Sequence, residues 1–213
     1  MKKVLFIFIF LSCVVCTTAP LNADTLTFNL DVTYAGPTSP LGNPPWLIAS
    51  FQDLDNKVLL TLEGFGLSGK ETAASWYLNF NPELDLPFVS YVSGPTAEVT
   101  LSQNGQQAGT ATGFDIAFSF RDPFVAGSKA EYEFYYLGSA SPLLASSFNF
   151  MNAGGTLYSA AQILGIGTNG SFSWIADSRD LNGSAPVPEP ASMFLLSTGL
   201  TGLAFFGRKK FLR

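Results

Sequence analysis

Residues 26–34 read L-T-F-N-L-D-V-T-Y, and every second side chain in this stretch is apolar. Such alternation is typical of a β-strand with one face in a core and the other in water. The same period of two recurs at 114–121 (F-D-I-A-F-S-F-R) and 131–136 (E-Y-E-F-Y-Y). The sequence therefore predicts an all-β domain. Further strand candidates are residues 46–51, 58–63, 76–80, 88–92, 98–101, 148–151, 157–166 and 172–176.

Glycine, proline, asparagine and serine separate these segments, and no stretch of the middle region sustains a helical period with caps at both ends. Residues 35–45 hold four prolines and two glycines, which predicts a long loop. One short helical turn could form at 159–164. Many short strands joined by turns predict a single antiparallel, jelly-roll-like β-sandwich, in which each sheet has one face in the core.

Charge and composition exclude several classes of function. The chain has no histidine, so Ser-His-Asp catalysis, Cys-His catalysis and His-containing zinc or copper sites are excluded. Residues 24–187 hold five of the 11 Lys and Arg residues and 15 of the 16 Asp and Glu residues, a net charge of −10. Such a surface repels nucleic acid and anionic lipid, so we expect no nucleic-acid partner. We also expect no cofactor.

The N-terminal end has the organisation of a secretory signal peptide. Two lysines precede an apolar run at 4–16, and small residues follow up to Ala23. The run has 13 residues, which is short for a bilayer span. We expect residues 1–23 to be cleaved between Ala23 and Asp24, an uncleaved anchor being the alternative. Both cysteines of the chain lie in the apolar run, so the exported protein would contain no disulfide.

The C-terminal end combines three features: a V-P-E-P motif, an apolar run at 191–207 and a basic tail at 208–213. Their order and spacing resemble the PEP-CTERM sorting signal of Gram-negative bacteria. A helix of 17 residues spans about 26 Å, the short edge of what crosses a bilayer, and cytoplasmic basic residues would stop its transfer. The alternative is an ordinary single-pass anchor. The motif residues are Val187, Pro188, Glu189 and Pro190, and the stop-transfer residues are Arg208, Lys209 and Lys210.

The resemblance implies a sorting route and partners. Exosortase in the inner membrane would recognise the signal while the C-terminal helix holds the protein in the membrane. The processed protein would then reach the cell surface, the outer envelope or the extracellular matrix. Genomes with this signal usually carry exopolysaccharide loci, which makes exopolysaccharide a second expected partner.

The middle region is similar to a recurrent β-rich passenger domain of PEP-CTERM proteins, a family that implies no established enzymatic activity. The resemblance rests on P-P-W at 44–46, W-Y-L-N-F-N-P at 76–82, F-D-I-A-F at 114–118 and A-A-Q-I-L-G-I-G at 160–167. The predicted organisation is a signal peptide at 1–23, a β-sandwich at 24–181, a linker at 182–187 and the sorting signal at 188–213 with its motif beginning at residue 187.

A glycine-rich stretch at 64–69 fits the nucleotide-binding pattern G-x-G-x-x-G, and 64–70 fits G-x-x-x-x-G-K. A phosphate-binding loop needs Ser or Thr after the lysine, where this chain has Glu71. Neither a parallel sheet nor a following helix is indicated. We therefore interpret 64–69 as a turn between strands.

Carboxylates are the remaining acid–base groups, and three pairs have the i, i+2 spacing that places both side chains on one face of a strand. Such pairs can bind Ca²⁺ or hydrolyse a glycoside, although polar residues on alternating strands usually face solvent. Asp53 and Asp55 are the best calcium candidate. The other pairs are Glu83 with Asp85 and Glu131 with Glu133.

Three tryptophans, Trp46, Trp76 and Trp174, could stack on sugar rings if they were exposed, but a tryptophan on an alternating strand is more often part of the core. Our first hypothesis is an exported, non-enzymatic structural or adhesive protein of the cell surface or exopolysaccharide matrix. A carbohydrate-binding module is the second hypothesis. A carboxylate-dependent glycoside hydrolase is the third.

Overall fold

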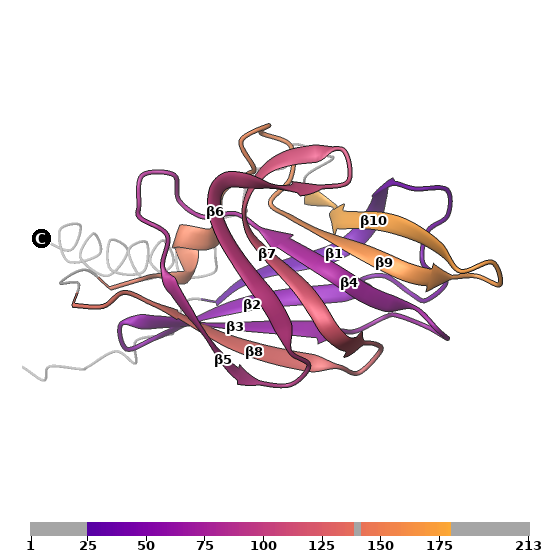
Figure 1. Ribbon diagram of the computed structural model, residues 1–213, viewed down its shortest axis with the longest axis horizontal. Helices are drawn as coiled ribbons and strands as arrows, with labels where there is room; N and C mark the ends of the chain where they lie inside the picture. The colour runs from indigo at the N-terminus through magenta and orange to yellow at the C-terminus, as the bar shows by residue number, and fades with distance from the viewer. Residues whose placement is uncertain (1–24, 139–141, 180–213) are drawn as a thin grey trace, which may run out of the picture.

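The computed structural model describes residues 25–138 and 142–179. Within them the chain forms ten β-strands and one short 3₁₀ helix (Figure 1). The elements are β1 (Thr25–Ala35), β2 (Leu47–Leu54), β3 (Lys57–Gly64), β4 (Thr72–Leu78), β5 (Phe88–Ser93), β6 (Ala97–Ala108), β7 (Ala111–Phe124), β8 (Lys129–Tyr135), η1 (Ala145–Phe148), β9 (Ser159–Ile166) and β10 (Ser171–Asp177).

The alternation in the sequence produces strands with one buried face. In β3 the side chains of Val58, Leu60 and Leu62 are fully buried, and the residues between them are partly exposed. β8 repeats this pattern with Tyr132 and Phe134 in the interior. Because consecutive side chains point to opposite faces of a strand, each apolar series lies against the core. The predicted all-β, antiparallel architecture is confirmed.

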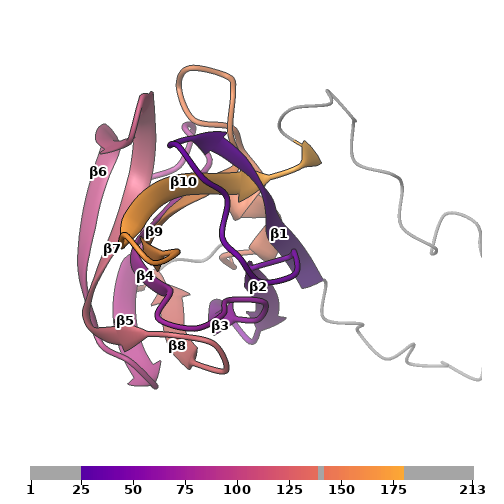
Figure 2. The same ribbon diagram turned by 90° about the vertical axis from the view of Figure 1, so that its right-hand side faces the viewer.

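All ten strands belong to one sheet, in the order β5-β8-β3-β2-β1-β10-β9-β4-β7-β6, and every pairing is antiparallel. The sheet curls until it nearly closes on itself (Figure 2). We call β5-β8-β3-β2-β1 the first half-sheet and β9-β4-β7-β6 the second half-sheet. The predicted sandwich requires two separate sheets. This detail was wrong, because β10 pairs with both β1 and β9 and so joins the half-sheets.

The main core fills the space between the two half-sheets. Phe118 of β7 contacts Tyr132 of β8 with ring centroids 4.8 Å apart, although the strands belong to opposite half-sheets. A smaller apolar cluster, which includes Phe114 and Ala176, lies apart from this core beside the β6–β7 turn. There Tyr34 donates a hydrogen bond to the Ala108 carbonyl (2.8 Å), and burial raises the pKa of Tyr34 far above its ordinary value. The domain therefore has two apolar clusters of unequal size.

Two local predictions were wrong. Residues 148–151 were expected to form a strand, but Phe148 ends η1 and packs between aromatic rings of the main core. The helical turn considered at 159–164 was wrong, whereas the strand expected at 157–166 is confirmed, because these residues form β9 and pair with β4 and β10. The long loop expected at 35–45 is present between β1 and β2.

Candidate functional site

The glycine-rich stretch forms the connection between β3 and β4, with no helix after it. Its glycines permit close backbone packing, since a Cβ on Gly66 would lie 1.9 Å from the Asn43 carbonyl oxygen. The carboxylate of Glu71 is buried there and accepts hydrogen bonds from the backbone N–H groups of Leu41 (2.6 Å) and Ser68 (2.8 Å). The carboxylate of Glu71 thus binds the backbone N–H groups of the loop that would otherwise be needed to bind a phosphate.

The calcium candidates, Asp53 and Asp55, lie in different local settings. Asp53 lies near the end of β2, and its Oδ1 accepts a hydrogen bond from the backbone N–H of Ala145, which begins η1. Asp55 is exposed in the two-residue turn to β3, where Asn56 has a φ of 66°. Within the described ranges, three or more Asp, Glu, Cys or His side chains nowhere gather in a metal-binding arrangement. Asp53 therefore acts as a cap for η1.

This placement predicts how the protein responds to calcium and to loss of Asp53. We expect EDTA to leave the melting temperature of the exported protein unchanged, whereas Asp53→Ala lowers the free energy of unfolding by about 1 kcal/mol through loss of the cap. Thermal melts with EDTA and with excess CaCl₂ measure both effects. Stabilisation of wild-type protein by CaCl₂ that disappears in Asp53→Asn would contradict the capping role, because a bound ion at 100 times Kd adds roughly 2.7 kcal/mol.

The other carboxylate pairs lie at the surface. Glu83 and Asp85 are exposed in the loop after β4 rather than on a strand. Glu131 and Glu133 do share one face of β8, and each binds a lysine at 2.7 Å, Lys129 and Lys57 respectively. The hydrogen bond from Lys129, together with one from Ser93, holds the pKa of Glu131 below its ordinary value. Lowering this pKa favours the ionised form, which cannot donate a proton in neutral solution.

The three tryptophans differ in environment. Trp46 is 5% exposed and donates its indole N–H to the Gly42 carbonyl, and Trp76 is fully buried with its indole N–H bonded to Ser159. Trp174 is partly buried against the smaller apolar cluster, with its ring centroid 5.8 Å from that of Tyr77. Two of the three candidate sugar-stacking side chains are thus core residues.

Sequence reasoning missed the three buried carboxylates, Glu71, Asp115 and Asp177. Asp115 accepts hydrogen bonds from the backbone N–H groups of Phe80 (2.9 Å) and Asn104 (2.7 Å). Alternation could not reveal it, because Asp115 is one of six consecutive buried residues in β7, from 113 to 118. The available signal in the sequence was that Asp115 is a polar residue inside a run of apolar neighbours.

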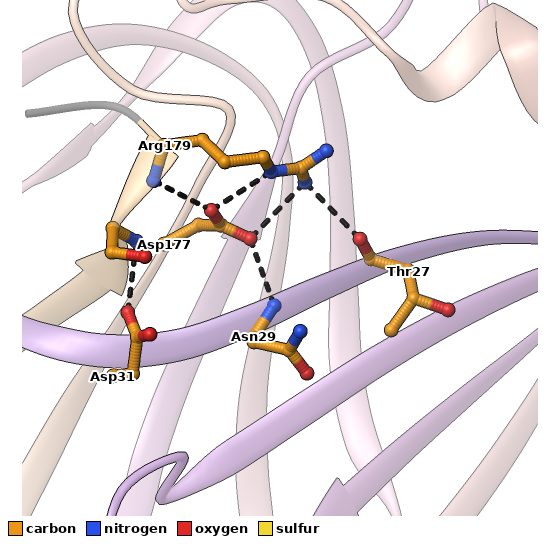
Figure 3. Close-up of polar contacts among 6 residues, drawn as sticks. Thr27, Asn29, Asp31, Asp177 and Arg179 are labelled. Atoms are coloured by element: carbon orange, nitrogen blue, oxygen red, sulfur yellow. Dashed lines mark hydrogen bonds and ion pairs between the residues drawn. The ribbon is translucent and has the colours of Figure 1, made fainter. Parts of the chain in front are cut away.

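The most extensively bonded group is the Asp177–Arg179 cluster, defined by Thr27, Asn29, Asp31, Asp177, Ser178 and Arg179 (Figure 3). Asp177 is 2% exposed and accepts hydrogen bonds from the backbone N–H of Asn29 and from the backbone N–H and guanidinium of Arg179. Arg179 also donates to the Thr27 carbonyl, and its guanidinium carbon lies 5.0 Å from the centroid of Phe28. The cluster fastens the end of β10 to β1.

These arrangements determine what the carboxylates can do chemically. Glu71, Asp115 and Asp177 each accept two or more hydrogen bonds, at least one of them from a backbone N–H distant in the sequence, and Glu131 and Glu133 are paired with lysines. Carboxylates bound in this way connect loops and strands. These hydrogen bonds and ion pairs favour a structural role for the acidic residues.

Both predicted terminal segments lie outside the described residues. This applies to the cleavage site at Ala23 and Asp24, to the motif from Val187 to Pro190, to the apolar run at 191–207 and to the stop-transfer residues from Arg208 to Lys210. In the part of the chain that the structure does describe, no helix has the length and apolar character needed to cross a bilayer. Evidence on the terminal segments comes from the sequence.

Comparison with known proteins provides that evidence. The family model described as the PEP-CTERM protein-sorting motif matches residues 186–210. No curated protein and no solved structure matches the chain. The matched residues include Glu189 and the basic residues from Arg208 to Lys210. The chain therefore carries a PEP-CTERM protein-sorting motif, which supports an exported protein sorted by exosortase.

Proposed function

We propose that the β domain is a non-enzymatic structural or adhesive component of the cell surface or of an exopolysaccharide matrix. The observation that supports it most is the use of the buried carboxylates, each of which holds backbone amides from distant parts of the fold. A protein without histidine has few other acid–base groups for catalysis. In this fold the buried carboxylates bind backbone N–H groups and so hold separate segments together.

The two alternative functions have less support. A tryptophan-based carbohydrate-binding module needs exposed indole rings, whereas Trp46 and Trp76 are buried. A glycoside hydrolase needs an acid with a raised pKa opposite a second carboxylate. The pKa of Glu131 is instead lowered by Lys129, and Glu133 is bound to Lys57. The glycoside hydrolase alternative makes a prediction that a complementation experiment can test.

The experiment compares variants in a strain that lacks the chromosomal copy, with cell aggregation and matrix retention as the measured properties. We expect wild-type protein to restore both. Glu189→Ala should fail because the sorting motif loses its only charge, so the protein is made but not delivered. Paired carboxylate-to-amide variants, Glu131→Gln with Glu133→Gln and Glu83→Gln with Asp85→Asn, should restore both properties fully.

Intact mass of the protein recovered from native cells serves as the control for processing at both ends. If a paired amide variant is delivered at wild-type level and folds normally but restores nothing, those carboxylates are catalytic and the structural role is wrong. Normal maturation of Glu189→Ala would show instead that the motif is not what directs sorting.

A further inference from the structure

One edge of the sheet exposes apolar side chains. β5 is the terminal strand of the first half-sheet and, among the described residues, pairs with β8 alone. Phe88, Tyr91 and Val92 of this strand are 52%, 51% and 44% exposed. Exposed apolar edge strands with free backbone donors and acceptors readily pair with a further strand.

The opposite edge differs in character. β6 carries mostly polar side chains, and its register with β7 shifts near Asn104, which has a φ of 54°. Glu98 of this strand is paired with Arg121. Charges and irregular register are features that discourage edge pairing. β5 also has a register shift with β8, between Tyr91 and Ser93, but it has no charged residue between positions 88 and 93, so the two edges differ in charge.

The sequence of β5 is complementary to itself. Residues 88–92 read F-V-S-Y-V. When two copies run antiparallel about Ser90, Phe88 faces Val92 of the other copy and Val89 faces Tyr91. Each aromatic side chain then faces a valine, a pairing that stabilises antiparallel strands. We propose that a second copy of this chain pairs with β5 in this register, with Ser90 on the two-fold axis.

The faces of the strand agree with this register. Phe88 and Ser90 pair with Tyr135 and Glu133, which lie on the outer face of β8, whereas Val89 pairs with the buried Phe134. Residues 88 and 90 therefore share one face, and 89 and 91 share the other, whereas Val92 lies where the register with β8 shifts. Phe88 is already stacked on Tyr135, with ring centroids 5.9 Å apart, and the Lys57 ammonium lies 5.9 Å from the centroid of the same Tyr135 ring. In the proposed register, Val92 of the second copy is placed opposite Phe88.

Electrostatics permit the pairing despite the acidic surface. Ser90 pairs with Glu133 of β8, so the carboxylates of Glu133 and its counterpart each lie one strand away from the axis. Three strand spacings of about 4.8 Å separate them, roughly 14 Å, which exceeds the Debye length at physiological ionic strength. Glu133 is in addition paired with Lys57. Because each copy uses the same edge, the contact closes after two copies.

This inference rests on the proposed structural role and specifies how it is performed, namely by self-association. The test uses Ser90→Cys in the exported protein on native cells, with copper phenanthroline as the oxidant. On the two-fold axis the two introduced thiols lie opposite each other, close enough for a disulfide. We expect a cross-linked dimer that dithiothreitol reverses. The matched control is Ser119→Cys, an exposed serine on β7, which should remain monomeric, as should wild-type protein.

A charge swap then tests the register. Phe88→Lys or Val92→Glu, each combined with Ser90→Cys, should lower the cross-linked fraction roughly tenfold, because each loses two aromatic–valine pairs. The combination of Phe88→Lys with Val92→Glu should restore cross-linking, since the introduced lysine faces the introduced carboxylate across the axis. Both positions are about half exposed, so folding should survive, and thermal melts of each variant verify this.

Equal cross-linking of Ser90→Cys and Ser119→Cys would overturn the proposal, because it would reflect crowding. An absent Ser90→Cys dimer would also overturn it, and protection of β5 by added polysaccharide would then identify a sugar as the occupant. Failure of the charge swap to restore the dimer would overturn the register. If complementation by the carboxylate variants still succeeds in these cases, the structural role stands without the pairing. A cross-linked dimer with failed complementation rejects only the structural role.

Discussion

Asp177→Ala should lower the free energy of unfolding by about 3 kcal/mol, the low end of the range for breaking a buried ion pair. The change removes the acceptor for the backbone N–H of Asn29 and leaves Arg179, whose side chain is 31% exposed, without its carboxylate. For a domain of this size, that corresponds to a loss of roughly 6 to 12 °C in melting temperature. Urea denaturation followed by tryptophan fluorescence measures it.

The controls separate the ion pair from the hydrogen bonds to the backbone. Arg179→Ala should cost less than Asp177→Ala, and the double variant should be little worse than Asp177→Ala alone, since Arg179 acts largely through this carboxylate. Asp31→Ala, which removes one acceptor from the Ser178 N–H, should cost about 1 kcal/mol. A loss below 1 kcal/mol for Asp177→Ala would mean that the cluster does not hold β10 to β1.

Phe148→Ala should lower the free energy of unfolding by about 3 to 5 kcal/mol, the range for removing a buried aromatic side chain. The Phe148 ring is fully buried, and its centroid lies 4.5 Å from that of Phe51 and 4.9 Å from that of Phe134. η1 is too short to repack across the resulting cavity. Chemical denaturation of the variant gives the value directly.

Phe65→Ala is the matched control, because the same side chain is removed from a position that is 59% exposed. It should change the free energy of unfolding by less than about 0.5 kcal/mol. Similar losses at positions 65 and 148 would falsify the assignment of Phe148 to the core, and would point to a general intolerance of phenylalanine loss.

Features that depend on neighbouring residues in the sequence were predictable from local patterns. The period of two located β1, β3 and β8 within a few residues, because it records which face of each strand is buried. The sorting motif was recognisable for the same reason, since its residues are contiguous between 186 and 210. Residues 148–151 were wrongly predicted to form a strand, because a single buried ring such as Phe148 resembles the start of an alternating series.

Features that depend on distant residues were not predictable. Asp177 is buried because its amide partner, Asn29, comes from β1, 148 residues earlier. Asp115 likewise depends on Phe80, 35 residues away. Alternation assigns polar residues to the outer face and has no information on such partners. The order in which the strands pair also depends on residues that are far apart in the sequence. One curled sheet and two stacked sheets therefore have the same sequence pattern.

The position of β10 has a consequence for export. An N-to-C passage across the inner membrane delivers β1 to β9 first, and these strands contain all pairings within the two half-sheets. Strand pairing cannot link the half-sheets until Ser171–Asp177 has crossed, because among the described residues only β10 pairs with both. From Arg179, seven peptide units lead to residue 186, at most about 24 Å of extended chain. Completion of the sheet is therefore a late event in export, and the sorting motif follows the completing strand within a short length of chain.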